Sequence, residues 1–114
     1  MNIKTNPQIP KVVQDCHNLL LWIIPILDKF PRNRRFTLGE RLESGLLNVL
    51  ENLVEAAYSK QKKSVLTRTN RQLEMIRHLW RLAFELQSIP KRSYQHGAKL
   101  MDEIGRQIGG WLRG

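Results

Sequence analysis

The chain has 114 residues, of which 41% are hydrophobic and 25% are charged, and these values fit a single globular domain. Its 19 Lys and Arg stand against 10 Asp and Glu, which gives a net charge of +9, and such an excess indicates a polyanionic partner where the cations are concentrated at particular places. A single Cys excludes an internal disulfide, and no apolar run reaches the roughly 18 residues of a membrane span, so we expect a cytoplasmic protein without membrane contacts.

The first helix is predicted over residues 10–29, where apolar side chains recur at intervals of three and four. Pro10 suits the first turn, where a backbone N–H is not needed. Pro25 lies inside the helix and removes the hydrogen bond to the carbonyl of Leu21, which predicts a kink. Residues 1–9 are predicted to form a loose tail.

The second helix is predicted over residues 38–60. Thr37 and Glu40 have the spacing of a capping box, in which each side chain accepts a hydrogen bond from the other residue's backbone N–H. The side chains predicted to be buried share a three-four spacing. They are Leu42, Leu46, Val49, Leu50, Leu53, Ala56 and Ala57.

Two further helices are predicted over residues 64–86 and 93–112, and Pro90 lies in the connection between them. Gly105, Gly109 and Gly110 weaken the last helix or allow another helix to approach closely. Four helices of about twenty residues with short connections predict an all-α fold. We expect one domain over residues 10–114, folded as an up-down-up-down antiparallel four-helix bundle.

The cations are not spread evenly along the chain, because residues 29–39, 56–73 and 86–101 contain no Asp or Glu. In the predicted bundle the first and third connections lie at one end and the second lies at the other. Positive charge is therefore expected at both ends. The cations of these stretches are Lys29, Arg32, Arg34, Arg35, Lys60, Lys62, Lys63, Arg68, Arg71, Lys91, Arg92 and Lys99.

Several of these cations precede predicted helix N-termini, where the helix dipole makes positive charge mildly unfavourable. Favourable placement at a helix C-terminus explains Lys29 and Lys60 but not the others. An anion that also uses the helix N-termini would explain them. We therefore predict that nucleic acid is bound by Arg32, Arg34, Arg35, Lys62, Lys63, Lys91 and Arg92.

The third helix offers further candidates, because four basic side chains fall within about 120° of one another, opposite the apolar stripe: Arg71, Arg77, His78 and Arg81. Arg77 and Arg81 are one turn apart and could grip the same nucleic-acid backbone. Glu74 and Glu85 share this sector, so a solvated face with paired charges is the alternative. Few aromatic residues lie in the polar sectors, which favours recognition of phosphates and shape over recognition of sequence.

The sequence contains no pattern typical of catalysis. His17, His78 and His96 lie on three different predicted helices, which does not favour a metal site. There is no Gly-rich phosphate loop, nucleophile elbow or HExxH motif. We expect no catalytic residues, no bound metal and no cofactor.

Four segments resemble the accessory variability determinant proteins, which accompany the reverse transcriptase of diversity-generating retroelements in bacteria and phages. The resemblance extends over nearly the whole chain from about residue 20. A related four-helix family, encoded within ribosomal RNA intervening sequences, shares the pattern of the first helical hairpin. The segments are LLWIIP at residues 20–25, KFPRNRRFTLG at 29–39, EAAYS at 55–59 and EIGRQIGGW at 103–111.

This resemblance implies a four-helix protomer assembled as a homopentamer with a basic surface. It implies binding of the template RNA, of cDNA or an RNA–DNA duplex, and of the reverse transcriptase, without enzymatic activity of its own. Arg77 and Arg81 match the family's arginine pair, and Arg32, Arg34 and Arg35 match its basic connection.

The leading hypothesis is a non-catalytic, nucleic-acid-binding subunit that supports mutagenic reverse transcription. One alternative is a purely structural assembly factor whose cations serve solubility. Another is a protein of the ribosomal intervening-sequence type.

Overall fold

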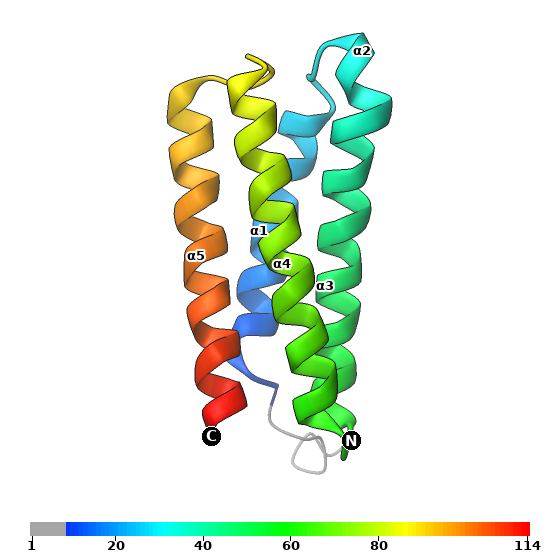
Figure 1. Cartoon of the computed structure of the whole chain (residues 1–114), viewed down its shortest axis with the longest axis vertical. Coiled ribbons are helices and arrows are strands. Elements are labelled where there is room, and N and C mark those ends of the chain that lie inside the picture. The colour runs from blue at the N-terminus through cyan, green and yellow to red at the C-terminus, as the bar shows by residue number, and fades with distance from the viewer. Residues whose placement is uncertain (1–8) are drawn as a thin grey trace, which may run out of the picture.

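The computed structural model describes residues 9–114, and within that range it contains helices and no strand (Figure 1). The expected tail, residues 1–9, falls almost wholly outside the described residues. The four long helices are joined by short connections, and two short helical segments precede α3. The elements are α1 (Lys11–Leu27), α2 (Arg32–Arg34), the π-helical turn η2 (Arg35–Gly39), α3 (Glu40–Tyr58), α4 (Lys62–Glu85) and α5 (Lys91–Arg113).

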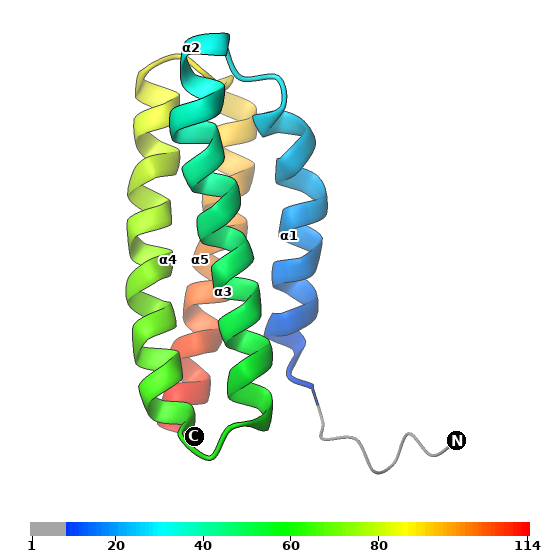
Figure 2. The same cartoon turned by 90° about the vertical axis from the view of Figure 1, so that its right-hand side faces the viewer.

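The four long helices run up and down in alternation, so the predicted antiparallel bundle is confirmed (Figures 1 and 2). Each long helix packs against two others: α3 contacts α1 and α4, and α5 contacts α4 and α1. The molecule measures 46 × 31 × 22 Å. The α1–α2 and α4–α5 connections lie at one end, called here the upper end, and the α3–α4 connection lies at the lower end.

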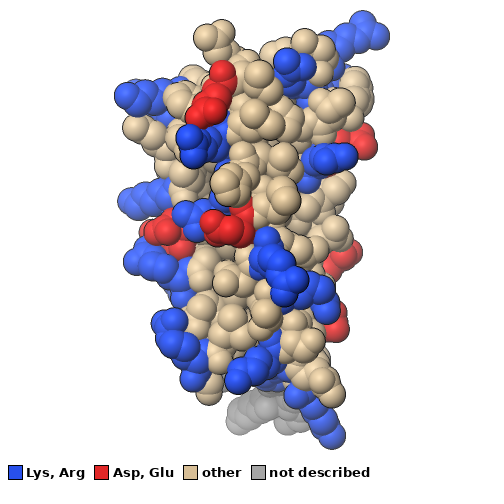
Figure 3. Space-filling view, viewed as in Figure 1, with Lys and Arg blue, Asp and Glu red and all other residues tan. Residues whose placement is uncertain are grey.

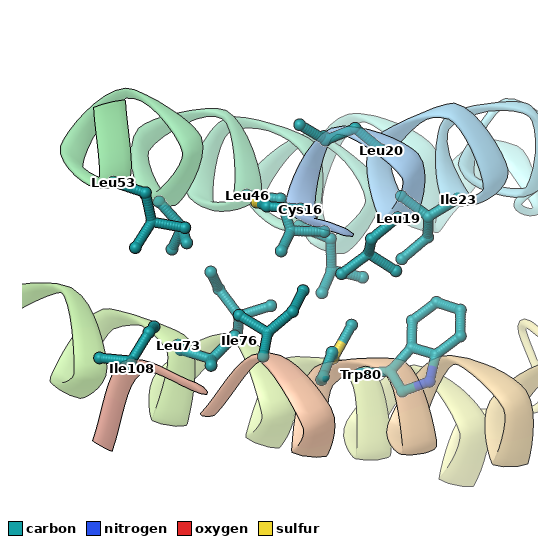
Figure 4. Close-up of a cluster of buried hydrophobic side chains, with 14 of the residues drawn as sticks. Cys16, Leu19, Leu20, Ile23, Leu46, Leu53, Leu73, Ile76, Trp80 and Ile108 are labelled. Atoms are coloured by element: carbon teal, nitrogen blue, oxygen red, sulfur yellow. The ribbon is translucent and has the colours of Figure 1, made fainter. Parts of the chain in front are cut away.

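Apolar side chains from all four long helices meet along the bundle axis (Figure 4). Burial follows the three-four spacing expected from the sequence, because only one face of each helix points inward. The most deeply buried side chains include Ile23 of α1, Leu46 of α3, Leu73 of α4 and Ile108 of α5. This core holds the helices in fixed register and thereby fixes where their charged faces point.

Trp80 joins α4 to α5 near the upper end. Its indole is only 1% exposed, and its Nε1 donates a hydrogen bond to the carbonyl oxygen of Tyr94 at 3.0 Å. A Cβ on Gly97 would lie 2.7 Å from the indole ring, so this position of α5 requires a glycine. Trp22 of α1 meets Trp80 edge-on, with ring centroids 6.2 Å apart.

The predicted capping box at Thr37 and Glu40 is wrong. Pro31 starts the helix earlier, because its carbonyl accepts hydrogen bonds from the N–H groups of Arg34 and Arg35 at 2.8 and 2.9 Å. The chain then passes through η2 into α3 without a break, and the Thr37 hydroxyl donates to the Arg34 carbonyl instead of capping a terminus.

The other boundaries differ by a few residues. The first helix ends at Leu27 and not at residue 29, whereas α4 and α5 each begin two residues before the predicted start. α5 also runs unbroken through its three late glycines to Arg113. As a result, the basic pairs of residues 62–63 and 91–92 lie inside the first helical turn.

Candidate nucleic-acid interface

Five of the predicted binding residues lie at the upper end of the bundle. Three are in the α2–η2 segment, and two begin α5 on the neighbouring connection (Figures 1 and 2). The antiparallel topology thus brings together residues that are about sixty positions apart in the sequence. We call this set the upper basic group: Arg32, Arg34, Arg35, Lys91 and Arg92.

The upper basic group has no ion pair with any carboxylate of residues 9–114. Arg35 donates to the carbonyl oxygen of Asp28 at 3.3 Å, and its guanidinium lies 4.8 Å from the ring centroid of the exposed Phe36. Asp28, Glu40 and Glu43 line the same surface hollow as Arg35, but their carboxylates lie beyond ion-pairing distance. The charge at this end is therefore available to an external anion.

The helix N-termini at this end also lack caps. α2 follows Pro31 and α5 follows Pro90, and neither proline can cap a helix with its side chain. Neither first turn contains an acidic residue. α4 begins in the same way after Gln61, with Lys62 and Lys63 in its first turn. Uncapped N–H groups beside cations form a favourable environment for phosphate.

A second basic surface surrounds the start of α4 at the lower end. Its cations line a shallow hollow of about 700 Å³, and the polar residues Gln61, Ser64 and Thr67 complete the lining. Lys62 lies beside this hollow and donates to the carbonyl of Ser59 at 2.7 Å. Within the described range, the one carboxylate within ion-pairing distance of these cations is that of Glu55, 3.9 Å from Arg68. We call this set the lower basic group: Lys60, Lys62, Lys63, Arg68 and Arg71.

Arg77 and Arg81 are the most strongly paired of the predicted binding residues. Arg77 lies 3.5 Å from Glu74 and 3.5 Å from Asp102 of α5, and Arg81 donates to Glu85 at 2.9 Å. The hydrogen bond to Glu85 raises the pKa of Arg81 above its ordinary value. Both arginines line a hollow of about 190 Å³ between α4 and α5. Arg71 lines a different hollow and belongs to the lower basic group, so the three arginines do not form one surface.

The space-filling view shows how the basic and the acidic side chains are distributed over one face of the molecule. Lys and Arg side chains lie at both ends and along the left edge, while acidic side chains lie near mid-height, at the upper left and along the right edge (Figure 3). The pairing of Glu74 and Glu85 agrees with the alternative recognised in the sequence. Asp102 could not be anticipated as a partner of Arg77, because it belongs to another helix and the sequence does not set the rotation of α5 against α4.

The described residues contain no cluster of three His, Cys, Asp or Glu side chains placed to hold a metal ion. Burial raises the pKa of the Cys16 thiol to about 12, so this side chain is an unreactive part of the core. Between residues 9 and 114, none of the helices has the length and apolar character needed to cross a membrane.

A family model described as bAvd-like matches residues 11–114, from the first residue of α1 to the end of the chain. The chain belongs to the bAvd-like family. This family is that of the bacterial accessory variability determinant, so the chain is an accessory protein of diversity-generating retroelements. The bAvd-like proteins are accessory determinants and are not known enzymes. No curated protein matches the chain.

Proposed function

We propose that this bAvd-like chain is a non-catalytic subunit that holds template RNA, or the RNA–cDNA duplex, beside the reverse transcriptase during mutagenic cDNA synthesis inside the cell. The observation that carries the proposal is the presence of cations at three helix N-termini with no carboxylate partner in the described part of the chain. They are Arg32, Arg34, Arg35, Lys62, Lys63, Lys91 and Arg92.

These positions are unfavourable for folding, because a cation in the first helical turn opposes the helix dipole by about 0.3–1 kcal/mol. A bound phosphate reverses the sign of this interaction, since it neutralises the cation and accepts hydrogen bonds from uncapped N–H groups. The binding surface contains few aromatic side chains for base stacking. We therefore expect recognition of backbone and shape with weak preference for sequence.

Contacts with other proteins are supported by two exposed apolar stripes on different helices. Met75 and Leu82 of α4 are 61% and 43% exposed, and Leu86, which directly follows α4, is 43% exposed; on α3 the exposed side chains are Leu47, Val54 and Tyr58. Two distinct stripes on one protomer suit a closed ring, in which each copy contacts one neighbour through the first stripe and the other neighbour through the second. We propose a homopentamer that also docks the reverse transcriptase.

A salt titration tests the nucleic-acid part of this proposal. Purified protein is titrated with structured RNA and with duplex DNA at several salt concentrations. The logarithm of the binding constant should fall steeply with the logarithm of salt, by about 0.9 for each phosphate contacted on a duplex. The variant with Arg32→Gln, Arg34→Gln and Arg35→Gln should show a slope lower by about two to three.

A flat salt response, or no binding at all, would contradict the proposal and favour the purely structural assembly factor. The pair Arg77→Ala and Arg81→Ala extends the test to the reverse-transcription complex. We expect a lower salt slope and loss of cDNA synthesis with the fold intact, measured by circular dichroism. Unchanged RNA binding together with unchanged cDNA yield would remove these two arginines from the binding surface.

A further inference from the structure

The outer face of α5 carries a row of cations that repeats every seven residues. Seven residues make two helical turns less about 20°, so the members of such a row stay on one face of the helix. The row spans 21 residue steps, or about 31 Å, with about 10 Å between neighbours. All four side chains are exposed. We call them the α5 row: Arg92, Lys99, Arg106 and Arg113.

Most of the α5 row is electrostatically unpaired. Arg92, Lys99 and Arg113 have no carboxylate within ion-pairing distance in the part of the chain that the structure describes. Arg106 lies 3.5 Å from Asp102, but Asp102 also faces Arg77 and cannot neutralise both arginines. α5 forms the left edge of the bundle in Figure 1, and Figure 3 shows basic side chains at several heights along that edge.

We propose that the α5 row is a track along which a nucleic-acid backbone lies lengthwise, and this inference rests on the proposed function. At 3.4 Å per step, 31 Å corresponds to about nine base pairs of a duplex. At its upper end the track includes Arg92 and so joins the upper basic group. Nucleic acid on this face would leave the apolar stripe of α4 open for protein contacts.

The composition of the row favours nucleic acid over a protein partner. Protein interfaces centre on buried aromatic or aliphatic side chains, surrounded by a polar rim. The exposed residues between its cations are Gln95, His96, Asp102 and Gly110, so the face is polar with a single exposed carboxylate, and it has no large exposed apolar side chain. Evenly spaced cations over 31 Å instead match a polymer whose negative charge repeats along its whole length.

A matched pair of double variants tests the track. Lys99→Gln with Arg113→Gln removes two cations of the row that have no ion pair. The control, Lys11→Gln with Arg41→Gln, removes the same net charge from α1 and α3, and it is matched in charge only, because Lys11 is ion-paired with Asp15. For duplex RNA and DNA, the row variant should bind at least about fivefold more weakly and lose about two units of salt slope. The control should keep the wild-type slope, and both variants should keep the wild-type far-ultraviolet circular dichroism spectrum.

Equal losses in the two variants would overturn the track, because the row would then contribute only net charge. A row variant that binds nucleic acid normally but no longer associates with the reverse transcriptase would also overturn it, in favour of a protein surface. If the wild-type chain binds no nucleic acid, the proposed function itself fails. The three failures are therefore distinguishable.

A length series tests the lengthwise orientation. With duplexes of 4 to 16 base pairs, the salt slope of the wild-type protein should increase until the duplex covers the row, at about nine base pairs or more. The slope of the row variant should stop increasing at a shorter length. A wild-type slope that is already constant at four or five base pairs would overturn the lengthwise placement.

Discussion

At the level of single residues, Gly97 is the glycine of α5 with the least room for a side chain. A Cβ there would overlap the ring of Trp80, whose indole is fixed by its hydrogen bond to Tyr94. Overpacking costs about 1–3 kcal/mol, whereas replacing a helical glycine with alanine gains up to about 1 kcal/mol. We expect Gly97→Ala to lower the free energy of unfolding by about 1–2 kcal/mol in urea denaturation.

Gly110 provides the control for that measurement. It is exposed on the same helix, and a Cβ there would have no neighbour closer than 4.0 Å. Gly110→Ala should therefore stabilise the protein by up to about 1 kcal/mol. If the two alanine variants had the same stability, Trp80 would not be held as tightly as the structure indicates.

The carboxyl group of Asp15 should make the free energy of unfolding of the bundle depend on pH. Its Oδ2 accepts hydrogen bonds from Lys11 at 2.6 Å and from Gln107 of α5 at 2.8 Å, and these donors lower the pKa of the Asp15 carboxyl. A lowered native pKa adds stability above the unfolded value near 4, and this contribution is lost as the pH falls through the native pKa.

Asp15→Asn should therefore lower the free energy of unfolding at pH 7, by less than about 1 kcal/mol because the pair is partly exposed. The difference between variant and wild type should shrink as the pH falls below 4, which urea denaturation at several pH values would show. A difference that stays constant from pH 7 to pH 2.5 would contradict the assigned role of the carboxylate.

The positions of individual cations along the chain were predictable, and so were partners on the same helix such as Glu74 and Glu85, but partners on another helix were not. The stretches without acidic residues correctly indicated that the two ends carry unpaired charge. Arg77, in contrast, was expected to share one face with Arg71, and its contact with Asp102 follows from helix packing that no local pattern encodes. The α5 row was overlooked although its seven-residue spacing is visible in the sequence, because only the bundle shows that this face of α5 points outward.

At the level of helices, the cations in the first turns of α4 and α5 should affect stability and RNA binding in opposite directions. If these cations serve a ligand, replacing them with acids should favour the fold and impair the function. Lys91→Glu with Arg92→Glu places two carboxylates near the positive end of the α5 dipole. We expect stability to increase by about 1 kcal/mol at low ionic strength, while the affinity for RNA falls. Thermal denaturation and RNA titration of the same preparation would check both effects.

The variant Lys62→Glu with Lys63→Glu should behave in the same way at the lower end. Arg113 lies in the last turn of α5, where a cation suits the dipole, so Arg113→Glu should lower stability instead. A loss of stability in the Lys91 and Arg92 variant would show that the fold itself needs these cations, so a bound anion would not be required to explain their position.

The helix boundaries also show the limits of sequence patterns. Apolar spacing located all four long helices, because each must bury one face. The start of α3 was misplaced because Thr37 and Glu40 match a capping box, while the carbonyl of Pro31 starts the helix two turns earlier. The π-helical turn η2 then takes up one residue more than an α-helical turn would, and the chain continues into α3. A π-helical turn follows from long-range packing and has no reliable local signature.

At the level of the whole molecule, the topology followed from four helices with short connections, and the placement of charge at both ends followed from the topology. Apolar residues outside the inward-facing side of a helix remain exposed in the structure. Leu82 and Leu86 keep a three-four spacing with their apolar neighbours, yet both are exposed on the side of α4 away from the core. A monomer with this surface has apolar area that a partner chain would cover.

Substitutions in the stripe on α4 therefore test whether copies of the chain associate through it. The variant with Met75→Gln, Leu82→Gln and Leu86→Gln changes only exposed side chains, so the bundle should keep its stability in urea to within about 1 kcal/mol. If the stripe is a subunit contact, sedimentation equilibrium should show the wild-type chain at a multiple of 13.4 kDa and the variant shifted towards 13.4 kDa. A variant that keeps the wild-type mass but no longer binds the reverse transcriptase would assign the stripe to the polymerase and leave the α3 stripe for self-association. The α5 row predicts that RNA affinity per protomer changes little in either case, because the row and the α4 stripe lie on different helices.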